Sequence, residues 1–218
     1  MMSEERVKEY QIGNMTLWLL SLRDLSDADL MEMYSRCGRE RKEKAAKIKA
    51  EGKKKQAVGA GYLISLLKEQ FSIADDPVIL PQGKPVFPGE QKVHFSISHS
   101  GDRVVLAFGD SPLGVDIEFI RQANLKLAGR FFTREEYEHL LQQETERQGE
   151  LFYRIWTGKE AVVKAAGCGL TLPLDGFSVS DETVMVSGKM YELHRQRFRG
   201  EGADFWISGA QLIKDPVK

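Results

Sequence analysis

The chain has 218 residues, of which 42% are hydrophobic and 29% are charged, a composition typical of a globular protein. Its net charge of -1 favours neither a nucleic-acid nor a membrane partner, and no apolar run approaches the roughly 18 residues of a membrane span. The polar start, Met1–Tyr10, is unlike a secretory signal, and Cys37 and Cys168 lack metal-ligand spacing. We therefore expect a cytoplasmic protein.

The first part of the chain is predicted to combine a buried strand with helices. We expect a strand at Met15–Leu22 and a helix capped by Ser26 or Asp27. A basic stretch follows at 39–55, and regularly spaced apolar residues predict a helix at Gln56–Phe71. The basic stretch is typical of a solvated helix face, although lysines and arginines on successive turns could also bind a polyphosphate.

Three short strands are predicted next. Apolar and polar residues alternate at Val93–Ser98 and Leu113–Phe119, and Arg103–Gly109, between two turns, is expected to be the strand between them. Turns at 100–102 and 110–112 would connect them as an antiparallel meander. The first and third strands of such a meander run in the same direction, so we expect their carboxyl ends at one edge of the sheet.

The second half is predicted to begin with helices and end with strands. Thr133 and Glu136 have the spacing of a capping box, and a strong helix is expected at Leu151–Ala166, after a polar connection at Gln142–Glu150. Strands are expected within Phe177–Ile213, separated by turns at Asp181-Glu182, Ser187-Gly188 and Gly200–Gly202. Each half thus contains strands and helices, which predicts an α+β protein with two lobes, 1–110 and 111–218.

Two carboxylates share one face of the third predicted strand. Asp116 and Glu118 are two residues apart, so their side chains should leave the same side of the sheet roughly 6–7 Å apart. Neighbouring carboxylates repel each other unless a cation lies between them, and Gly114 on the same face leaves room for a close approach. A solvated strand face with two ordinary acids remains an alternative.

Glu160 and Lys164 are four residues apart and should share one face of the helix at Leu151–Ala166. An exposed pair of this kind contributes only about 0.3–0.5 kcal/mol. Gly158 costs a helix about 1 kcal/mol, which suggests a close approach there. The nearby Trp156 also makes this side of the helix too apolar for a fully solvated face. A surface ion pair and a functional pair both stay open on these grounds.

Further candidates for phosphate binding lie outside these two segments. Ser98 and His99 come at the end of the first strand of the meander, at the same edge as Glu118. Lys84 follows Gly83, where the backbone is accessible. A histidine in a turn is more often an ordinary turn residue, so the pattern alone does not assign His99.

Together, these segments resemble the signature of the 4'-phosphopantetheinyl transferases. Leu113–Glu118 is similar to [VI]-G-[VI]-D, and after a gap of about forty residues Trp156–Lys164 matches [FW]-[SCT]-x-K-E-[SA]-x-x-K at every fixed position. Only Leu113 departs from the pattern. Four further blocks resemble the Sfp-type branch: Gly83–Pro85, Phe95–Ser100, Arg130–Thr133 and Gly169–Leu174. The resemblance covers roughly residues 15 to 210.

The resemblance implies two similar α+β lobes related by a pseudo-twofold axis, with coenzyme A bound between them. Lobe 1–110 would hold the nucleotide side of coenzyme A, and lobe 111–218 would carry the metal and catalytic motifs. The implied reaction transfers the 4'-phosphopantetheine arm to a serine of an apo carrier protein and releases adenosine 3',5'-bisphosphate. Acyl, aryl or peptidyl carriers of fatty-acid, polyketide or nonribosomal peptide synthesis could accept the arm, and the branch leans toward the latter two. A monomer is expected.

The resemblance also implies roles for particular residues. Asp116, Glu118 and Glu160 would bind Mg²⁺, with Mn²⁺ as an alternative, and the number of ions is left open. Glu160, directly or through a metal-bound water, would be the base for the carrier serine. Lys164 would hold the pyrophosphate and offset the charge on the departing phosphate.

The nucleotide contacts of the family carry over to Arg41, Lys44, Lys84, Ser98 and His99. Where the family has an arginine followed by serine or threonine, this chain has Lys55-Gln56-Ala57. Either Lys55 and Gln56 take those roles or a contact is missing.

Aromatic residues near the signature allow two interpretations. Phe131, Phe132 and Trp156 could line the channel for the pantetheine arm or belong to the core.

Two rival functions are less consistent with the sequence. A non-catalytic module that binds coenzyme A or a carrier should have lost at least one of the three carboxylates or Lys164, and all are present. Another metal-dependent phosphotransferase would more often use a G-x-x-x-x-G-K-[ST] loop, which the sequence lacks.

Overall fold

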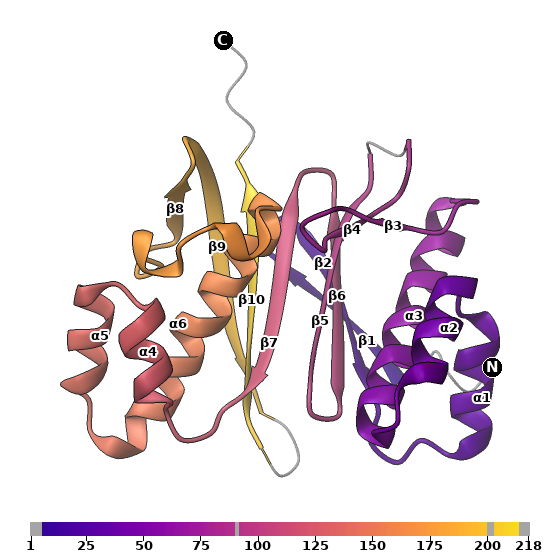
Figure 1. Cartoon of the computed structure of the whole chain (residues 1–218), viewed down its shortest axis with the longest axis horizontal. Helices are drawn as coiled ribbons and strands as arrows, with labels where there is room; N and C mark the ends of the chain where they lie inside the picture. The colour runs from indigo at the N-terminus through magenta and orange to yellow at the C-terminus, as the bar shows by residue number, and fades with distance from the viewer. Residues whose placement is uncertain (1–5, 90–91, 200–202, 214–218) are drawn as a thin grey trace.

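The computed structural model describes residues 6–89, 92–199 and 203–213, and in it two four-stranded sheets pack against each other. Helices cover the outer face of each sheet, so the molecule has four layers in the order helix, sheet, sheet, helix (Figure 1). The two halves are similar α/β units, as the sequence predicts. No helix in the described ranges combines the length and the apolar character of a membrane span.

The first half contains one sheet in the strand order β1-β2-β6-β5 and one short two-stranded sheet. Its elements are β1 (Val7–Ile12), β2 (Met15–Ser21), α1 (Asp27–Arg36), α2 (Arg39–Lys47), α3 (Glu51–Phe71), β3 (Val78–Ile79), β4 (Pro85–Val86), β5 (His94–Ser100) and β6 (Arg103–Gly109). Ser26 caps α1 by accepting a hydrogen bond from the backbone N–H of Asp29. The helix expected at Gln56–Phe71 begins five residues earlier, within the basic stretch.

The second half contains the sheet β7-β10-β9-β8. Its elements are β7 (Leu113–Phe119), α4 (Leu125–Phe131), α5 (Arg134–Leu141), α6 (Thr145–Ala166), the 3₁₀ turns η2 (Gly169–Thr171) and η3 (Leu174–Gly176), β8 (Thr183–Val186), β9 (Lys189–Phe198) and β10 (Phe205–Leu212). The capping box of Thr133 and Glu136 is confirmed. The expected connection at Gln142–Glu150 is largely helical, because α6 begins at Thr145. The turn expected at Gly200–Gly202 lies outside the described residues.

The inner faces of the two sheets share one apolar core. Leu17 and Val105 of the first sheet are fully buried in it, together with Val115 and Ile207 of the second. Each sheet also packs against the helices on its outer face through a separate core. The apolar residues of β7 thus face the other sheet, and its polar face is turned toward α6.

The strands β5 and β7 lie side by side where the edges of the two sheets meet. They do not form the expected meander, because β7 pairs with β10 and belongs to the second sheet. Side-chain hydroxyl groups link the two strands instead: Ser96 Oγ accepts from the N–H of Val115 at 3.1 Å, and Ser98 Oγ lies 2.6 Å from Asp116 Oδ1. The residue numbers of the contacting pairs increase together along both strands. The strands therefore run in the same direction, as expected.

Candidate functional site

The contact between β7 and α6 depends on Gly114. A Cβ atom at this position would lie 2.1 Å from the carbonyl oxygen of Ala161 and 2.4 Å from the backbone N of Ala165. The close approach that the sequence suggested at Gly114 is therefore made by the backbone of α6. The same expectation for Gly158 is wrong, because its Cβ would lie 3.4 Å or more from Val179 and other neighbours, an ordinary contact.

Asp116 and Lys164 form an ion pair at the centre of the junction. The Nζ atom of Lys164 lies 2.6 Å from Asp116 Oδ1 and donates to the carbonyl of Val115 at 3.0 Å. Ser98 joins them, since its hydroxyl donates to Asp116 Oδ1 and lies 3.1 Å from Lys164 Nζ. Asp116 is only 5% exposed, so a solvated strand face is ruled out for it.

Glu118 lies two residues further along β7 and is half-buried. Ser100 Oγ donates to its Oε2 atom at 2.6 Å and also accepts weakly from the N–H of Phe119. Burial raises the pKa of Glu118, the hydrogen bond from Ser100 lowers it, and the charge of Asp116 raises it further, with a net upward shift.

Glu160 faces the same cluster from α6. Burial raises its pKa above the ordinary value, and the negative charges of Asp116 and Glu118 add to this effect, while Lys164 opposes it. The helix thus brings a third carboxylate to the two on β7. A carboxylate with a raised pKa is a stronger base than an exposed one.

No three His, Cys, Asp or Glu side chains in the described ranges are close enough to enclose a metal ion as they stand. Two features nevertheless fit a cation among Asp116, Glu118 and Glu160. Within the described part of the chain, Asp116 Oδ2 is buried and has no hydrogen-bond partner. The carboxylates also raise the pKa values of Glu118 and Glu160 through their repulsion. Oxygen ligands with excess negative charge suit a hard divalent cation, which would relieve both features.

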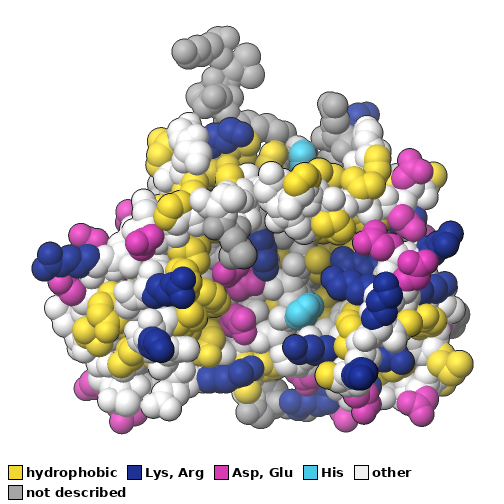
Figure 2. All heavy atoms as spheres, in the orientation of Figure 1, with side chains coloured by type: hydrophobic (Ala, Val, Ile, Leu, Met, Phe, Trp, Pro, Cys, Tyr) yellow, Lys and Arg dark blue, Asp and Glu magenta, His cyan; other side chains and the backbone are white. Residues whose placement is uncertain are grey.

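His99 lies inside β5, which continues to Ser100, so the turn position expected for it is wrong. Its side chain is exposed, and its pKa is lowered, mainly by partial desolvation and further by the charges of Lys164 and Lys44, while Asp116 opposes the shift. Lys44 of α2 is therefore close enough to act on His99. Figure 2 shows acidic side chains and a histidine in the hollow between the halves, with Lys and Arg gathered on the first half beside it.

Lys84 reaches from the first half into the second. Its Nζ atom donates to the carbonyls of Lys164 at 2.7 Å, Leu113 at 3.0 Å and Ala165 at 3.5 Å. Desolvation lowers its pKa to about 8. In the structure Lys84 is thus a link between the halves, beside the candidate site.

The other predicted phosphate contacts differ in their surroundings. Arg41 lines a separate cavity of about 420 Å³ on the outer side of α2 and α3, and burial lowers its pKa. Lys55 forms an ion pair with Glu51 at 3.0 Å. Gln56 donates to the carbonyl of Gly101 at 2.8 Å. The structure therefore brings Lys44 and His99 toward the acidic cluster and places Gln56 against Gly101, the residue that follows Ser100. Arg41 and Lys55 have the separate surroundings just described.

A groove of about 510 Å³ opens beside the acidic cluster. Glu160 and Lys164 line it on one side, and it is bounded by Gln82–Pro85 of the first half and Leu172–Asp175 of the second. Phe131 also lines the groove. Phe132 and Trp156, which were predicted to line a channel or join the core, pack in the core of the second half with Phe152.

Two residues without a predicted role, Ser100 and Lys159, lie in or next to the site. Ser100 holds Glu118, and Lys159 lies next to Glu160 but turns into the core of the second half. Both belong to quoted motifs, Phe95–Ser100 and Trp156–Lys164, so the motif positions themselves were a signal. What the sequence could not supply was the partner of each side chain.

The structure thus has two similar halves, with a groove lined by residues of both beside the acidic cluster and its lysine. The sequence profile of the 4'-phosphopantetheinyl transferase superfamily matches residues 112–201, which contain Asp116, Glu118, Glu160 and Lys164. The 4'-phosphopantetheinyl transferase ffp of Bacillus subtilis is 35% identical over 181 residues, 81% of each chain. The chain therefore belongs to the 4'-phosphopantetheinyl transferase superfamily.

Further relatives place the chain in the Sfp-type branch. The 4'-phosphopantetheinyl transferase Sfp of Bacillus subtilis strain 168 is 46% identical over 97 residues, which are 44% of this chain and 43% of Sfp. The 4'-phosphopantetheinyl transferase psf-1 of Bacillus pumilus is 38% identical over 124 residues, 56% of this chain and 53% of that protein.

Proposed function

We propose that the chain transfers the 4'-phosphopantetheine arm of coenzyme A to a serine of an apo carrier protein and releases adenosine 3',5'-bisphosphate. The serine oxygen bonds to the phosphorus that carries the arm, the bond from that phosphorus to the adenosine-bearing phosphate breaks, and the serine loses its proton. The observation that carries the proposal is the meeting of both signature segments at one acidic cluster, in a chain 35% identical to a named transferase over 81% of its length.

Glu160 is the proposed base for the carrier serine. Its raised pKa, its place at the groove and its position opposite Asp116 support this role. Lys164 is proposed to hold the pyrophosphate and to offset the charge that develops on the departing phosphate. To reach a phosphate its ammonium group must release one of its present acceptors, which are Asp116 Oδ1 at 2.6 Å, the carbonyl of Val115 and Ser98 Oγ.

Asp116, Glu118 and Glu160 are the proposed ligands of Mg²⁺. Bound there, the ion would neutralise charge on the phosphate oxygens. Asp116 would contribute its unpartnered Oδ2 atom, and Ser98 and Ser100 would keep the carboxylates of β7 in place through the hydrogen bonds at 2.6 Å.

The nucleotide side of coenzyme A is assigned to lobe 1–110, and the metal and catalytic residues to lobe 111–218. His99 and Lys44 are the best supported nucleotide contacts, because the charges of Asp116, Lys164 and Lys44 all act on His99. Four further residues remain proposed contacts: Lys84, Ser98, Arg41 and Lys55. In the structure Lys84 binds backbone carbonyls, Ser98 binds Asp116, Arg41 lines a separate cavity and Lys55 pairs with Glu51. We expect a monomer, since both halves lie in one chain. We expect neither a nucleic acid nor a membrane as a partner.

Mass spectrometry of a panel of apo carriers tests the proposal. The carriers are mixed with the protein, coenzyme A and Mg²⁺, and each accepted arm adds the mass of one phosphopantetheine. We expect labelling of at least one carrier, and loss of labelling with EDTA that Mg²⁺ restores. Binding of coenzyme A without any labelling would favour the non-catalytic module, and labelling that survives EDTA would remove the metal from the mechanism.

A further inference from the structure

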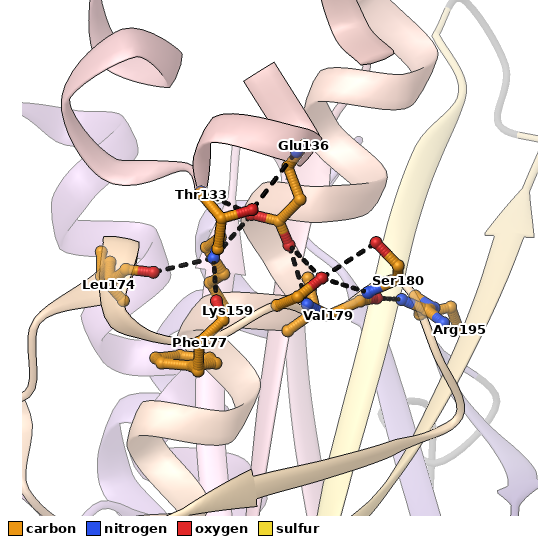
Figure 3. Close-up of polar contacts among 9 residues, drawn as sticks. Thr133, Glu136, Lys159, Leu174, Phe177, Val179, Ser180 and Arg195 are labelled. Atoms are coloured by element: carbon orange, nitrogen blue, oxygen red, sulfur yellow. Dashed lines mark hydrogen bonds and ion pairs between the residues drawn. The ribbon is translucent and has the colours of Figure 1, made fainter. Parts of the chain in front are cut away.

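A second cluster of charged residues lies in the second half, away from the acidic cluster. Lys159 is fully buried on α6, immediately before Glu160, and Glu136 on α5 is 2% exposed. Their Nζ and Oε2 atoms are 2.8 Å apart. Figure 3 shows Lys159 and Glu136 pointing toward each other among the carbonyl groups of the segment that follows α6. Buried charges of this kind persist when hydrogen bonds satisfy them completely.

The ammonium group of Lys159 has an acceptor for each of its three hydrogens. Besides Glu136, it donates to the carbonyl of Leu174 at 2.7 Å and to that of Phe177 at 2.5 Å. The ring of Phe177 lies 4.7 Å from the same nitrogen. Lys159 of α6 thus forms hydrogen bonds to two carbonyl groups of one short segment. This segment contains the 3₁₀ turn η3.

Glu136 completes the cluster from the other side. Its Oε1 atom accepts from the N–H of Val179 at 2.7 Å and from Ser178 Oγ at 3.3 Å. Its Oε2 atom also accepts from the N–H of Thr133 at 2.9 Å, as the capping box of α5 requires. The pair therefore joins the start of α5, the middle of α6 and the backbone of 174–179.

The anchored segment forms one wall of the groove. Leu172, Pro173, Leu174 and Asp175 line it together with Gln82–Pro85 of the first half, and Glu160 lines the same groove. Lys159 therefore contacts the wall with its ammonium group, while the next residue of the helix faces the groove. Displacement of the wall would change the shape of the groove at Glu160 without removing any group of the acidic cluster.

We propose that Lys159 is a positioning residue of the transfer site, which fixes the wall 172–177 to α6 through the carbonyls of Leu174 and Phe177. This inference rests on the proposed function, because it concerns the groove at Glu160. A purely structural ion pair would affect stability alone. A positioning residue also affects the geometry of transfer, where a misplacement of about 1 Å can cost about 100-fold in rate.

The test compares Lys159→Met with the double variant Lys159→Met/Glu136→Gln. Lys159→Met keeps the length of the side chain but leaves a buried carboxylate unpaired, so it should lower stability. The double variant removes that charge and should recover much of the stability, yet it still cannot bind the two carbonyls. We expect both variants to transfer about 10-fold more slowly or worse at saturating coenzyme A. Hydrogen exchange at 172–177 should accelerate at least ~10-fold in both.

Two measurements keep the interpretation specific. Affinity for adenosine 3',5'-bisphosphate should stay within about 2-fold, because this product lacks the arm that the groove would face. Glu138→Gln on the same helix α5 removes an exposed ion pair with Arg134 and should change neither exchange nor rate.

The inference is overturned if the rate recovers together with stability in the double variant, or if exchange at 172–177 stays at the wild-type level. A wild-type protein that labels no carrier overturns the proposed function and this role with it. If the wild type labels a carrier and the variants label it equally fast, the inference is overturned and the proposed function is not.

Discussion

Two lysines of the same helix each pair with a carboxylate, and the two pairs differ in what surrounds them. Lys164 lies 2.6 Å from Asp116, with side chains 29% and 7% exposed, and Lys159 lies 2.8 Å from Glu136, with side chains 0% and 1% exposed. Both distances are those of a charge-assisted hydrogen bond. Distance alone therefore does not distinguish the candidate site from a structural pair.

The balance of charge and hydrogen bonds does distinguish them. Around Lys159 each donor has an acceptor and both oxygens of Glu136 have donors. Around Lys164 one lysine faces three carboxylates, two of which have raised pKa values, and the buried Oδ2 atom of Asp116 has no partner among the residues that the structure describes. A satisfied cluster stabilises the fold, whereas an unsatisfied one retains negative charge that a cation and its phosphate ligand can neutralise.

The strongest test of this contrast exchanges one carboxylate for an amide in each pair. Glu136→Gln leaves a buried ammonium without its counter-charge, so we expect the free energy of unfolding to fall by about 3–5 kcal/mol. Asp116→Asn relieves repulsion among the carboxylates, so stability should be unchanged or higher, while carrier labelling falls at least ~100-fold. Urea unfolding and labelling rates measure both. Equal destabilisation by the two changes would remove the distinction between the pairs.

Gly114→Ala should break the spacing between β7 and α6 on which the acidic cluster depends. A Cβ atom 2.1 Å from the carbonyl of Ala161 forces strand and helix apart, and we expect a loss of about 1–3 kcal/mol in stability together with slower labelling. Gly158→Ala is the matched control. Gly158 lies in the same helix α6, but its Cβ atom would make only ordinary contacts, with Val179 and Leu193. If both alanines behave alike, steric contact at Gly114 does not set the geometry.

Ser100→Ala should have a smaller effect, restricted to Glu118. The hydroxyl of Ser100 lowers the pKa of Glu118, so its loss should raise that pKa and move the acid limb of the labelling rate to higher pH. We expect the rate to fall about 3–10-fold, most strongly below neutral pH, for a hydrogen bond of about 1 kcal/mol. Ser35→Ala, which removes an exposed hydroxyl bonded to the carbonyl of Glu32, should leave the profile in place. An unshifted acid limb in Ser100→Ala would contradict the assignment.

The last prediction concerns the link formed by Lys84, where the expected effect is confined to alkaline pH. Its pKa falls from the ordinary 10.5 to about 8, so between these values the folded protein binds fewer protons than the unfolded chain. Stability of the wild type relative to Lys84→Met should therefore grow as pH rises from 8 to 10.5, by about 1 kcal/mol or more. Paired urea unfolding curves at pH 7.5 and pH 10 measure the change, and a constant difference would show that Lys84 is not desolvated.

Local patterns predicted much of the fold and of the site. Alternation placed Asp116 and Glu118 on one face of β7, and the capping box placed the start of α5 at Thr133. These features depend on neighbours within a few residues. The same capping box did not reveal that Glu136 also binds Lys159, because the two residues meet only when α5 packs on α6.

Features with a weak local pattern or a distant partner were missed. The strand β1 was not predicted, since Val7–Ile12 is an edge strand in which only Ile12 is buried. The start of α6 at Thr145 was also missed, because its first turns are polar and lack an apolar stripe. The partner of β7 was wrong for a similar reason: β6 is adjacent in sequence, but β7 pairs with β10, about ninety residues away.

That pairing has a consequence for the order in which the protein is made. The first sheet has all its strands once residue 109 has been synthesised, and β7 follows within ten residues. Its partner β10, however, lies between β7 and β9 in the finished sheet and is the last of the described strands to leave the ribosome. Asp116 and Glu118 thus emerge early on a strand whose hydrogen-bonding partner is made last. A nascent chain of 200 residues would carry every residue assigned to transfer, yet lack the strand that fixes two of them.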